Sequence, residues 1–368
     1  MFRTIKVRLI GNIESLVQTA TLYTKACQTA LDYGFQNKTH SKSKVDSGTY
    51  DTIRDTLKQL PSGLVQCARD QACDMLKREK LKTLSTKKTL QVRYDNRTFK
   101  FYPESEYVSL STVNGRQEFQ IKVYDYCKQY LTGTYTNAQL VIRKGRAFLN
   151  VQCEIEGYPT NDNNQVLGID RGILNIVTCS DNSFVNSKDL RDVKGRYRYL
   201  RAKLQSLGTA SARRKLKKLS GAERRFVLDT NHVVSKWIVQ KPFGILTVEA
   251  LQIGKTRSRK FNKLLGSWSY GQLLTLLKYK AEDAGKIIVE IDPRHTSQQC
   301  NKCGYIDRKN RKGLKFKCIR CGFELHSDLN GSRNIAERGI SVLGRLPVNQ
   351  PIVTPLAVTG YRSMTGSS

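Results

Sequence analysis

The sequence predicts a multidomain protein of mixed α+β and α/β class, and three features of the chain support this fold class. The period of the apolar residues changes from helical to alternating near Leu90. Strands and helices alternate after residue 165, and two Cys-x2-Cys pairs lie further on. A chain of 368 residues has room for two or three folded units at roughly 100–200 residues each. We therefore expect a β-rich N-terminal domain, a C-terminal α/β domain and a small metal-binding insert.

The N-terminal region begins with a predicted strand over residues 2–10 and then changes to a helical pattern. Apolar side chains recur every three or four residues between Ile13 and Leu31, as on one face of a helix. The polar stretch 36–50 predicts a loop, and residues 51–83 predict further helices. These features indicate a helical unit over residues 12–85.

From about Leu90 apolar and polar residues alternate, which is typical of half-buried strands. Asn114-Gly115 predicts a tight hairpin turn, and Lys144-Gly145 predicts a second one. Because the first strand can join this antiparallel sheet, we expect one β-barrel-like domain formed by residues 1–11 and 86–160. The helical unit would then be an insertion in this domain.

The second half of the chain alternates between predicted strands and helices. The predicted strands lie within residues 166–179, 244–251 and 286–292, and the predicted helices cover residues 226–240 and 270–285. This alternation is typical of an α/β domain with a partly parallel sheet. We expect it to comprise residues 165–293 and 325–342, with an insert over residues 294–324. The proline-containing tail, 343–368, is expected to be flexible.

The charge of the chain indicates a polyanionic partner. Lys and Arg number 63 against 31 Asp and Glu, so the formal net charge is +32. Nucleic acid fits such a surplus, because each neutralised phosphate releases a counterion. A basic ribosome-associated protein or a membrane-surface protein is the alternative. No apolar run approaches the roughly 18 residues that span a bilayer, and the N-terminus lacks a secretory profile, so we expect no membrane partner.

Four clustered cysteines predict a zinc site: Cys300, Cys303, Cys318 and Cys321 follow a C-x2-C-x14-C-x2-C spacing. Each pair can place two thiolates on one tight turn, and two such turns complete a tetrahedron. Four protein ligands leave no open position, so the sequence predicts one structural Zn²⁺. Redox cysteines are the alternative. The loop between the pairs is rich in Lys and Arg, which suggests additional contact with phosphate.

Residues 186–225 form the most basic stretch, with fourteen Lys and Arg against three acids. We expect this stretch to contact nucleic-acid backbones, with an aromatic side chain stacking on bases. The alternative is a solvated pair of charged helices. The candidate contact residues are Arg196, Tyr197, Arg198, Arg213, Arg214, Lys215, Lys217 and Lys218.

Three acids are candidates for a catalytic metal site. Asp170 follows a predicted strand, Glu249 ends another, and Asp328 lies at the start of a predicted helix. Taken singly, the acids could be a turn cap, a strand-end charge and a helix N-cap. Their order along the chain is that of an RNase H-like nuclease. Convergent carboxylates suit Mg²⁺, and two such ions can activate water and stabilise the leaving oxygen of a phosphodiester.

Several segments of the second half resemble a known family. They are GIDRG (168–172), FVLDTNHVVSKWIV (226–239), VEAL (248–251), YKAEDAGKIIVEIDPRHTSQQCNKCG (279–304) and FKCIRCGFELHSDLNGSRNIAERG (316–339). With these motifs the sequence resembles TnpB, the nuclease family of bacterial insertion sequences, which is related to the type V CRISPR effectors. The N-terminal half resembles the family only in its layout of a strand, a helical insert and more strands.

The resemblance implies a RuvC-like nuclease domain in which Asp170, Glu249 and Asp328 hold two Mg²⁺ ions. It implies a wedge domain and a helical recognition domain in the N-terminal half, and a zinc module inserted before the last acid. It further implies RNA-guided cleavage of double-stranded target DNA, with a guide made from the element's own end. The expected location is the bacterial cytoplasm, at the nucleoid when DNA is bound.

Two other functions remain open from the sequence. A transposase that joins strands itself could use the same three acids. A guided DNA-binding regulator without cleavage would be expected to lack one of the acids, and all three are present. The oligomeric state is not predicted.

Overall fold

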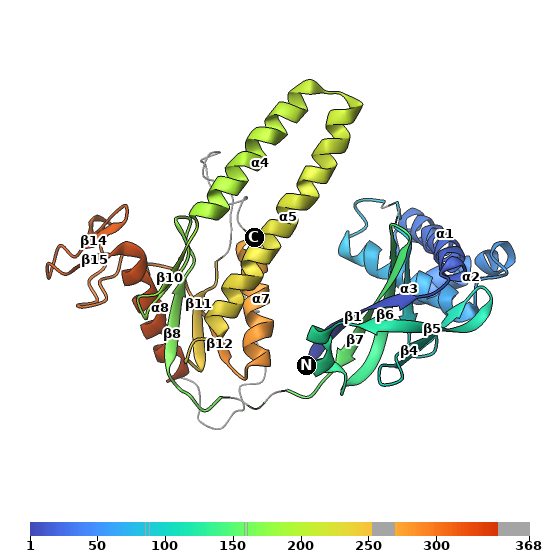
Figure 1. Ribbon diagram of the computed structural model, residues 1–368, viewed down its shortest axis with the longest axis horizontal. Helices are drawn as coiled ribbons and strands as arrows, with labels where there is room; N and C mark the ends of the chain where they lie inside the picture. Colours follow the sequence, from blue (N-terminus) through green and yellow to red (C-terminus); the bar gives the residue numbers. More distant parts are fainter. Residues whose placement is uncertain (85, 88, 158, 160, 252–268, 345–368) are drawn as a thin grey trace, which may run out of the picture. The chain divides into compact units, whose positions relative to one another are not determined.

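A computed structural model describes residues 1–344 except residues 85, 88, 158, 160 and 252–268 (Figure 1). The chain divides into two compact units, Met1–Glu156 and Gly157–Ser368. Within the described part of the chain, no helix has the length and apolar character needed to cross a bilayer.

The first unit is built on a seven-stranded antiparallel sheet of order β2-β6-β7-β1-β5-β4-β3. Its strands are β1 Phe2–Ile10, β2 Gln91–Asp95, β3 Phe99–Tyr102, β4 Tyr107–Thr112, β5 Gly115–Val123, β6 Thr134–Arg143 and β7 Arg146–Glu154. Gly115 and Gly145 have φ angles of 85° and 69°, the left-handed conformation that a tight hairpin turn requires. Both predicted hairpins are therefore present.

The sheet is strongly curled, as the connection between β2 and β3 requires. These strands stand at opposite ends of the strand order, yet only residues 96–98 separate them. A flat sheet of seven strands would place its edges about 29 Å apart at ~4.8 Å per strand. Four residue steps reach at most about 14 Å. The β-barrel-like character that the sequence predicts is thus confirmed.

Three helices lie between β1 and β2 in the chain: α1 Glu14–Gln36, α2 Lys42–Thr56 and α3 Ser62–Arg78. They share one apolar core with the sheet, and the buried hydroxyl of Tyr23 on α1 donates to the carbonyl of Cys67 on α3 at 3.0 Å. The loop predicted over residues 36–50 is wrong from Lys42 onward. A short 3₁₀ helix, η1 Asp125–Tyr130, precedes β6.

The second unit contains a five-stranded mixed sheet of order β10-β9-β8-β11-β12. The strands are β8 Val166–Asp170, β9 Asn175–Cys179, β10 Phe184–Asn186, β11 Ile245–Glu249 and β12 Ile287–Ile291. Strands β8, β11 and β12 are parallel, whereas β9 and β10 form antiparallel pairs at one edge. The predicted partly parallel sheet is present.

Helices cover both faces of this sheet (Figure 1). They are the C-terminal part of α5 Ala210–Val239, α7 Tyr270–Asp283 and α8 Ser327–Leu343, whereas α4 Lys188–Leu207 extends from the sheet beside the first half of α5. The C-terminal part of α5 and α7 pack against Leu167, Ile169, Leu246 and Val248. Helix α8 packs on the alternate positions, where Ile335 joins Ile245. Successive side chains of a strand point to opposite faces, so α8 lies across the sheet from α5 and α7.

Two glycines allow α8 to lie close to the sheet. A side-chain carbon at Gly168 on β8 would clash with the backbone carbonyl of Ser332, and one at Gly339 would clash with the hydroxyl of Thr247. Glycine is therefore required at these two contacts, because any larger side chain would push the helix outward.

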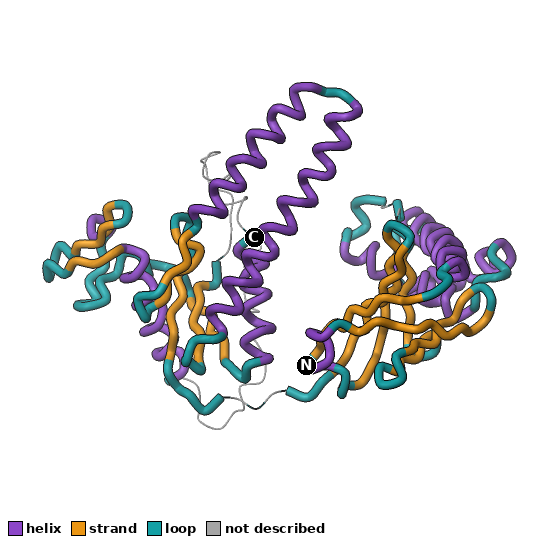
Figure 2. The backbone as a smooth tube through the Cα atoms, viewed as in Figure 1, coloured by secondary structure: helices purple, strands orange, loops and turns teal. Residues whose placement is uncertain are grey.

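A small module lies between β12 and α8. It contains η2 Arg308–Asn310 and the antiparallel strands β13 Arg311–Lys312, β14 Lys315–Lys317 and β15 Glu324–His326. The flexible tail was expected over residues 343–368, and residues 345–368 lie outside the described residues. Leu343 is the last residue of α8, and Gly344 follows it. The structure confirms the predicted α+β class with a barrel-like sheet and a four-cysteine module. Figure 2 traces helices, strands and loops along the chain.

Candidate functional site

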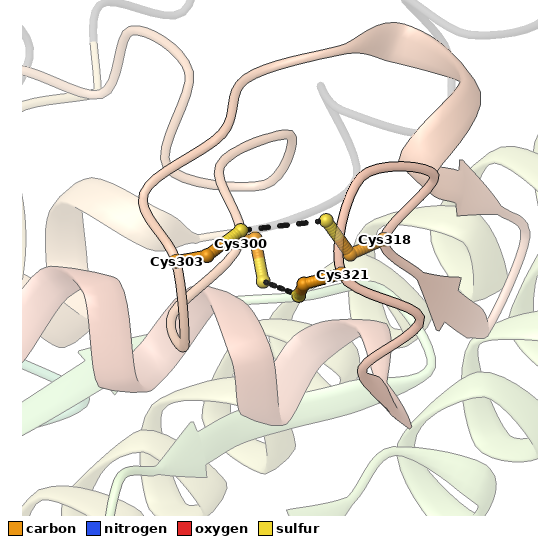
Figure 3. Close-up of side chains that lie close together, drawn as sticks. All are labelled: Cys300, Cys303, Cys318 and Cys321. Carbon is orange, nitrogen blue, oxygen red and sulfur yellow. Dashed lines mark hydrogen bonds between the residues drawn. The ribbon is translucent and has the colours of Figure 1, made fainter.

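The four cysteines form one cluster in the small module (Figure 3). The Sγ atoms of Cys300 and Cys321 lie 3.7 Å apart, and those of Cys303 and Cys318 lie 3.6 Å apart. All four Sγ atoms are within 4.8 Å of one another. A tetrahedral zinc site with Zn–S bonds of ~2.3 Å has S–S edges of about 3.8 Å. The cluster therefore has the spacing of a four-thiolate metal site.

Both cysteine pairs lie on turns of the same construction. In the first turn, Gly304 donates its backbone N–H to the carbonyl of Cys300 at 2.8 Å, and in the second Gly322 donates to Cys318 at 2.9 Å. Gly304 and Gly322 have φ angles of 72° and 71°. This left-handed conformation favours glycine, so the residue after each pair helps to form the turn that carries the two cysteines.

The three candidate acids converge on the α8 side of the five-stranded sheet. Asp170 is the last residue of β8, and Glu249 is the last residue of the neighbouring parallel strand β11. Gly168 of β8 pairs with Thr247 of β11, and both residues face α8. Side chains two residues apart on a strand point to the same face, so Asp170 and Glu249 also face α8. Asp328 lies in the first turn of α8 itself.

The three carboxyl groups lie near enough to one another for their charges to interact. The pKa of Asp170 is raised to about 8, first by desolvation and then by repulsion from Glu249 and Asp328. A side-chain carbon at Gly331 of α8 would lie 3.1 Å from the Oδ2 atom of Asp170. The Asp170 carboxyl group therefore lies against the helix that carries Asp328.

The acids are nevertheless more widely spaced than the thiolates. Among the described residues, the four cysteines are the one set of three or more His, Cys, Asp or Glu with all ligand atoms within 4.8 Å. Within the described residues, the three acids therefore do not form a closed ligand cluster like that of the thiolates.

Glu249 is buried and is held by two partners that the sequence analysis missed. Desolvation raises its pKa, and a hydrogen bond from the Thr296 hydroxyl to its Oε1 atom, at 2.5 Å, opposes that rise. Arg171, also buried, donates from Nη2 to the backbone carbonyl of Glu249 at 2.5 Å. The Asp-Arg-Gly sequence that begins at the last residue of β8 was a local signal for Arg171, whereas nothing near Glu249 in the sequence pointed to Thr296.

Asp328 is not the N-cap of α8. That position belongs to His326, whose Nδ1 atom accepts the backbone N–H of Asp328 at 3.3 Å. The carboxylate of Asp328 instead lies 3.3 Å from Arg311 Nη2 and 3.4 Å from Asn175 Nδ2. The sequence-based alternative that Asp328 is a helix N-cap is therefore wrong. Arg311 and Asn175 are two further residues near the site that the sequence analysis missed.

The basic stretch forms an antiparallel helical hairpin of α4 and the first half of α5, which extends from the sheet (Figure 1). Of the eight candidate contact residues, Tyr197 is half-buried and the seven cations are exposed. The candidates line both helices and do not gather at one point. Arg201 of α4 pairs with Glu223 of α5, and Arg213 donates to the Gly208 carbonyl at the turn. The other six candidate cations are exposed to solvent along the two helices.

Two family models match the second half of the chain. One, described as a probable transposase, covers residues 150–260 and includes Asp170 and Glu249. The other, the Cas12f1-like TNB domain, covers residues 270–335 and includes the four cysteines and Asp328. Together with relatives named TnpB-like, these matches confirm the predicted resemblance to TnpB and the type V effectors.

The CRISPR-associated endodeoxyribonuclease Cas12f1 of Sulfoacidibacillus thermotolerans is 41% identical over 110 residues, which are 29% of this chain and 26% of that protein. The putative RNA-guided DNA endonuclease InsQ of Escherichia coli (strain K12) is 26% identical over 237 residues, 58% of this chain and 59% of that protein. The chain thus spans less than two thirds of either relative. The structure of the mini-RNA-guided endonuclease CRISPR-Cas phi3 shares the fold, with a TM-score of 0.57 and 9% identity over 95% of this chain and 94% of that chain.

Proposed function

We propose that this chain is an RNA-guided DNA endonuclease that hydrolyses phosphodiester bonds with divalent cations. The observation that carries the proposal is the convergence of Asp170, Glu249 and Asp328 from two adjacent parallel strands and a helix. The names of similar proteins, RNA-guided DNA endonuclease and endodeoxyribonuclease, support DNA as the substrate.

The fold supports a RuvC-like assignment for the second unit. Antiparallel strands at one edge, parallel strands at the other and helices on both faces are the layout of an RNase H-like domain. We assign residues 165–293 and 325–342 to this domain and residues 294–324 to a zinc insert. Residues 1–11 and 86–160 would be the wedge domain and residues 12–85 the recognition domain; up to Glu156 these belong to the first unit.

The acids fit divalent cations such as Mg²⁺. Carboxylate oxygens are the hard ligands that Mg²⁺ prefers, and a cation would relieve the repulsion that raises the pKa of Asp170. Asp170, Glu249 and Asp328 would hold two such ions, which would supply activation of water and stabilisation of the leaving oxygen of a phosphodiester. The chain itself contributes the placement of the acids: the sheet fixes Asp170 and Glu249, and α8 fixes Asp328.

The remaining features have supporting roles in this proposal. The cysteine cluster would hold one structural Zn²⁺, since its four thiolates fill a tetrahedron. The α4–α5 hairpin would contact the backbones of guide RNA and double-stranded target DNA. Backbone contacts suit a protein whose guide reads the target sequence by base pairing.

An Asp170→Ala variant tests the proposal. The full chain is purified with its bound RNA, the RNA is sequenced, and DNA matching the guide is offered with Mg²⁺. Cleavage should fall by roughly 10³-fold or more, as after loss of other essential catalytic groups. RNA content and target binding should be retained. Asp229→Ala, which removes an exposed acid on α5, serves as the matched control and should cleave normally.

Two results would contradict the guided-nuclease proposal. The matching family described as a probable transposase makes strand transfer the second candidate, and joined strands formed by RNA-free protein would support it. A parent complex that binds the target without cutting it would support a guided DNA-binding regulator. Cleavage by the Asp170→Ala variant would show that the acids are assigned wrongly.

A further inference from the structure

Thr296 lies in the segment that connects β12 to the first cysteine pair and touches one of the three acids. Its side chain is buried, with 3% of the residue exposed. The hydroxyl oxygen is 2.5 Å from Glu249 Oε1 and 3.0 Å from the carbonyl oxygen of Pro293. A hydroxyl has one hydrogen to donate, and both the shorter distance and the negative charge favour the carboxylate.

The backbone around Thr296 is held by two buried asparagines of α8. Asn334 Nδ2 donates to the carbonyl oxygens of Thr296 and Gln299, at 2.8 and 2.7 Å. Asn330 Nδ2 donates to Gln299 at 2.7 Å, and its Oδ1 accepts the backbone N–H of Asn301 at 3.1 Å. These amides satisfy backbone groups that would otherwise be buried without partners. The segment is therefore fixed in register on α8.

This clamp links two of the acids and the metal cluster to one helix. Asp328 belongs to α8, and Glu249 is tied to α8 through Thr296 and Asn334. The residues on either side of Cys300 are fastened to the same helix by Asn330. A shift of the first cysteine turn would thus move the group that holds Glu249.

We propose that Thr296 is a positioning residue whose hydroxyl orients the Glu249 carboxylate for binding a divalent cation. The inference rests on the proposed function, because it concerns the same three acids. Groups that hydrogen bond a metal-ligating side chain fix its orientation, and their loss typically costs about 10–100-fold in metal affinity or activity.

Thr296→Val and Thr296→Ser separate the hydroxyl from the shape of the side chain. Valine keeps the branched shape without the hydroxyl, whereas serine keeps the hydroxyl. In the RNA-bound full chain, Thr296→Val should raise the Mg²⁺ concentration for half-maximal cleavage by about tenfold. Cleavage should recover largely at saturating Mg²⁺, and Thr296→Ser should behave like the parent.

Binding of Mn²⁺ gives a second readout that does not depend on cleavage. It is measured by electron paramagnetic resonance on the same RNA-bound protein, with the Asp170→Ala complex as the blank for ions bound elsewhere. After this blank is subtracted, Thr296→Val should weaken Mn²⁺ binding at the three acids by about tenfold, while Thr296→Ser should not weaken it. Thr275→Val is the control, because the Thr275 hydroxyl on α7 donates only to the backbone of its own helix in the described structure.

The outcomes are distinguishable. Parent-like Mg²⁺ dependence and Mn²⁺ affinity in Thr296→Val would overturn the inference and leave the proposed function intact. Equal losses in the valine and serine variants would also overturn it, since packing and not the hydroxyl would be responsible. If valine prevents folding, Thr296→Ala replaces it in the comparison. If the parent does not cleave DNA, the proposed function fails, while the Mn²⁺ titration still tests Thr296.

Discussion

At the scale of single residues, the catalytic proposal depends on acids that the fold forces together. Asp170 ends a strand beside Glu249 and lies against the helix that carries Asp328. The folded chain opposes ionisation of Asp170, first through desolvation and then through its two acidic neighbours, and its pKa rises to about 8. Bringing the three acids together therefore lowers the stability of the fold, and a bound cation would offset this loss.

This raised pKa predicts a pH-dependent effect of Asp170→Asn in magnesium-free buffer that retains zinc. The folded parent holds the Asp170 proton more tightly than the unfolded chain does. That contribution to stability is full below about pH 4 and is lost as the pH rises toward 8. The variant should therefore match the parent near pH 4 and be more stable at pH 8, on the order of 2 kcal/mol after allowance for solvent screening.

Urea unfolding at several pH values measures this difference. The exposed acid Asp55 on α2 supplies the control, and Asp55→Asn should differ from the parent by a similar small amount at every pH. Adding Mg²⁺ should narrow the gap, because a cation that binds only the folded parent stabilises it by mass action. A gap of constant size from pH 4 to pH 8 would contradict the interpretation.

The sequence could predict the acids but not the side chains around them. Asp170, Glu249 and Asp328 stand at the ends of recognisable strands or at a helix start, so local pattern and order were sufficient to suggest them. Thr296 is 47 positions from Glu249, and Asn175 is 153 positions from Asp328. Such contacts depend on how elements pair in three dimensions, and no local period encodes that pairing.

At the scale of elements, the sequence predicted turns and helices that have strong local signals. It did not predict elements whose stability depends on packing against residues far away in the chain. The Asn114-Gly115 and Lys144-Gly145 turns are present because their backbone preferences are local. Helix α2 was mistaken in part for a loop because its sequence is largely polar. Its buried residues Val45, Thr49 and Ile53 repeat every four positions and form a narrow stripe that packs in the helical core. Tertiary contacts thus supply the stability that the local sequence does not.

The small module offers a prediction about elements acting together. Cys318 directly follows β14, and β14 pairs with β15, which leads into α8 and Asp328. Cys318→Ser would remove a ligand from the cluster, loosen this hairpin and displace Asp328. Zinc content should fall from about one ion per chain toward zero. Cleavage should fall by about tenfold or more.

Metal analysis by mass spectrometry and the guided cleavage assay test this pair of effects on the same preparation. Ile319→Ala is the control, because Ile319 lies between the two cysteines of the second turn and is 54% exposed. It should retain both zinc and cleavage. A Cys318→Ser protein that loses zinc but cuts at the parent rate would show that the module is dispensable for placing Asp328.

At the scale of the whole molecule, the net charge of +32 is distributed unevenly, and the α4–α5 hairpin carries a large part of it. The α4–α5 hairpin bears fourteen Lys and Arg and three acids over residues 186–225. Arg201 of α4 forms an ion pair with Glu223 of α5. Exposed cations such as Arg196, Arg214 and Lys217 on the two long helices favour extended contact with a phosphate backbone.

Replacing Arg214, Lys217 and Lys218 together with Ala tests this role through the salt dependence of RNA and DNA binding. All three are exposed on α5, and Arg213 is left unchanged because its guanidinium holds the turn at Gly208. Each lost phosphate contact lowers the slope of log K against log salt by about 0.9 for duplex DNA. The triple variant should therefore bind more weakly at low salt, with a slope smaller by up to about 2–3.

A matched triple replacement elsewhere separates the hairpin from net charge alone. Lys58, Lys77 and Lys100 are exposed in the Met1–Glu156 unit, and their replacement with Ala removes the same charge. Because a lost phosphate contact changes the slope and a change of net charge without such a contact does not, this control should keep the parent slope. Equal losses in both variants would mean that overall charge governs binding. A hairpin variant with the parent slope would show that the three cations are merely solvated.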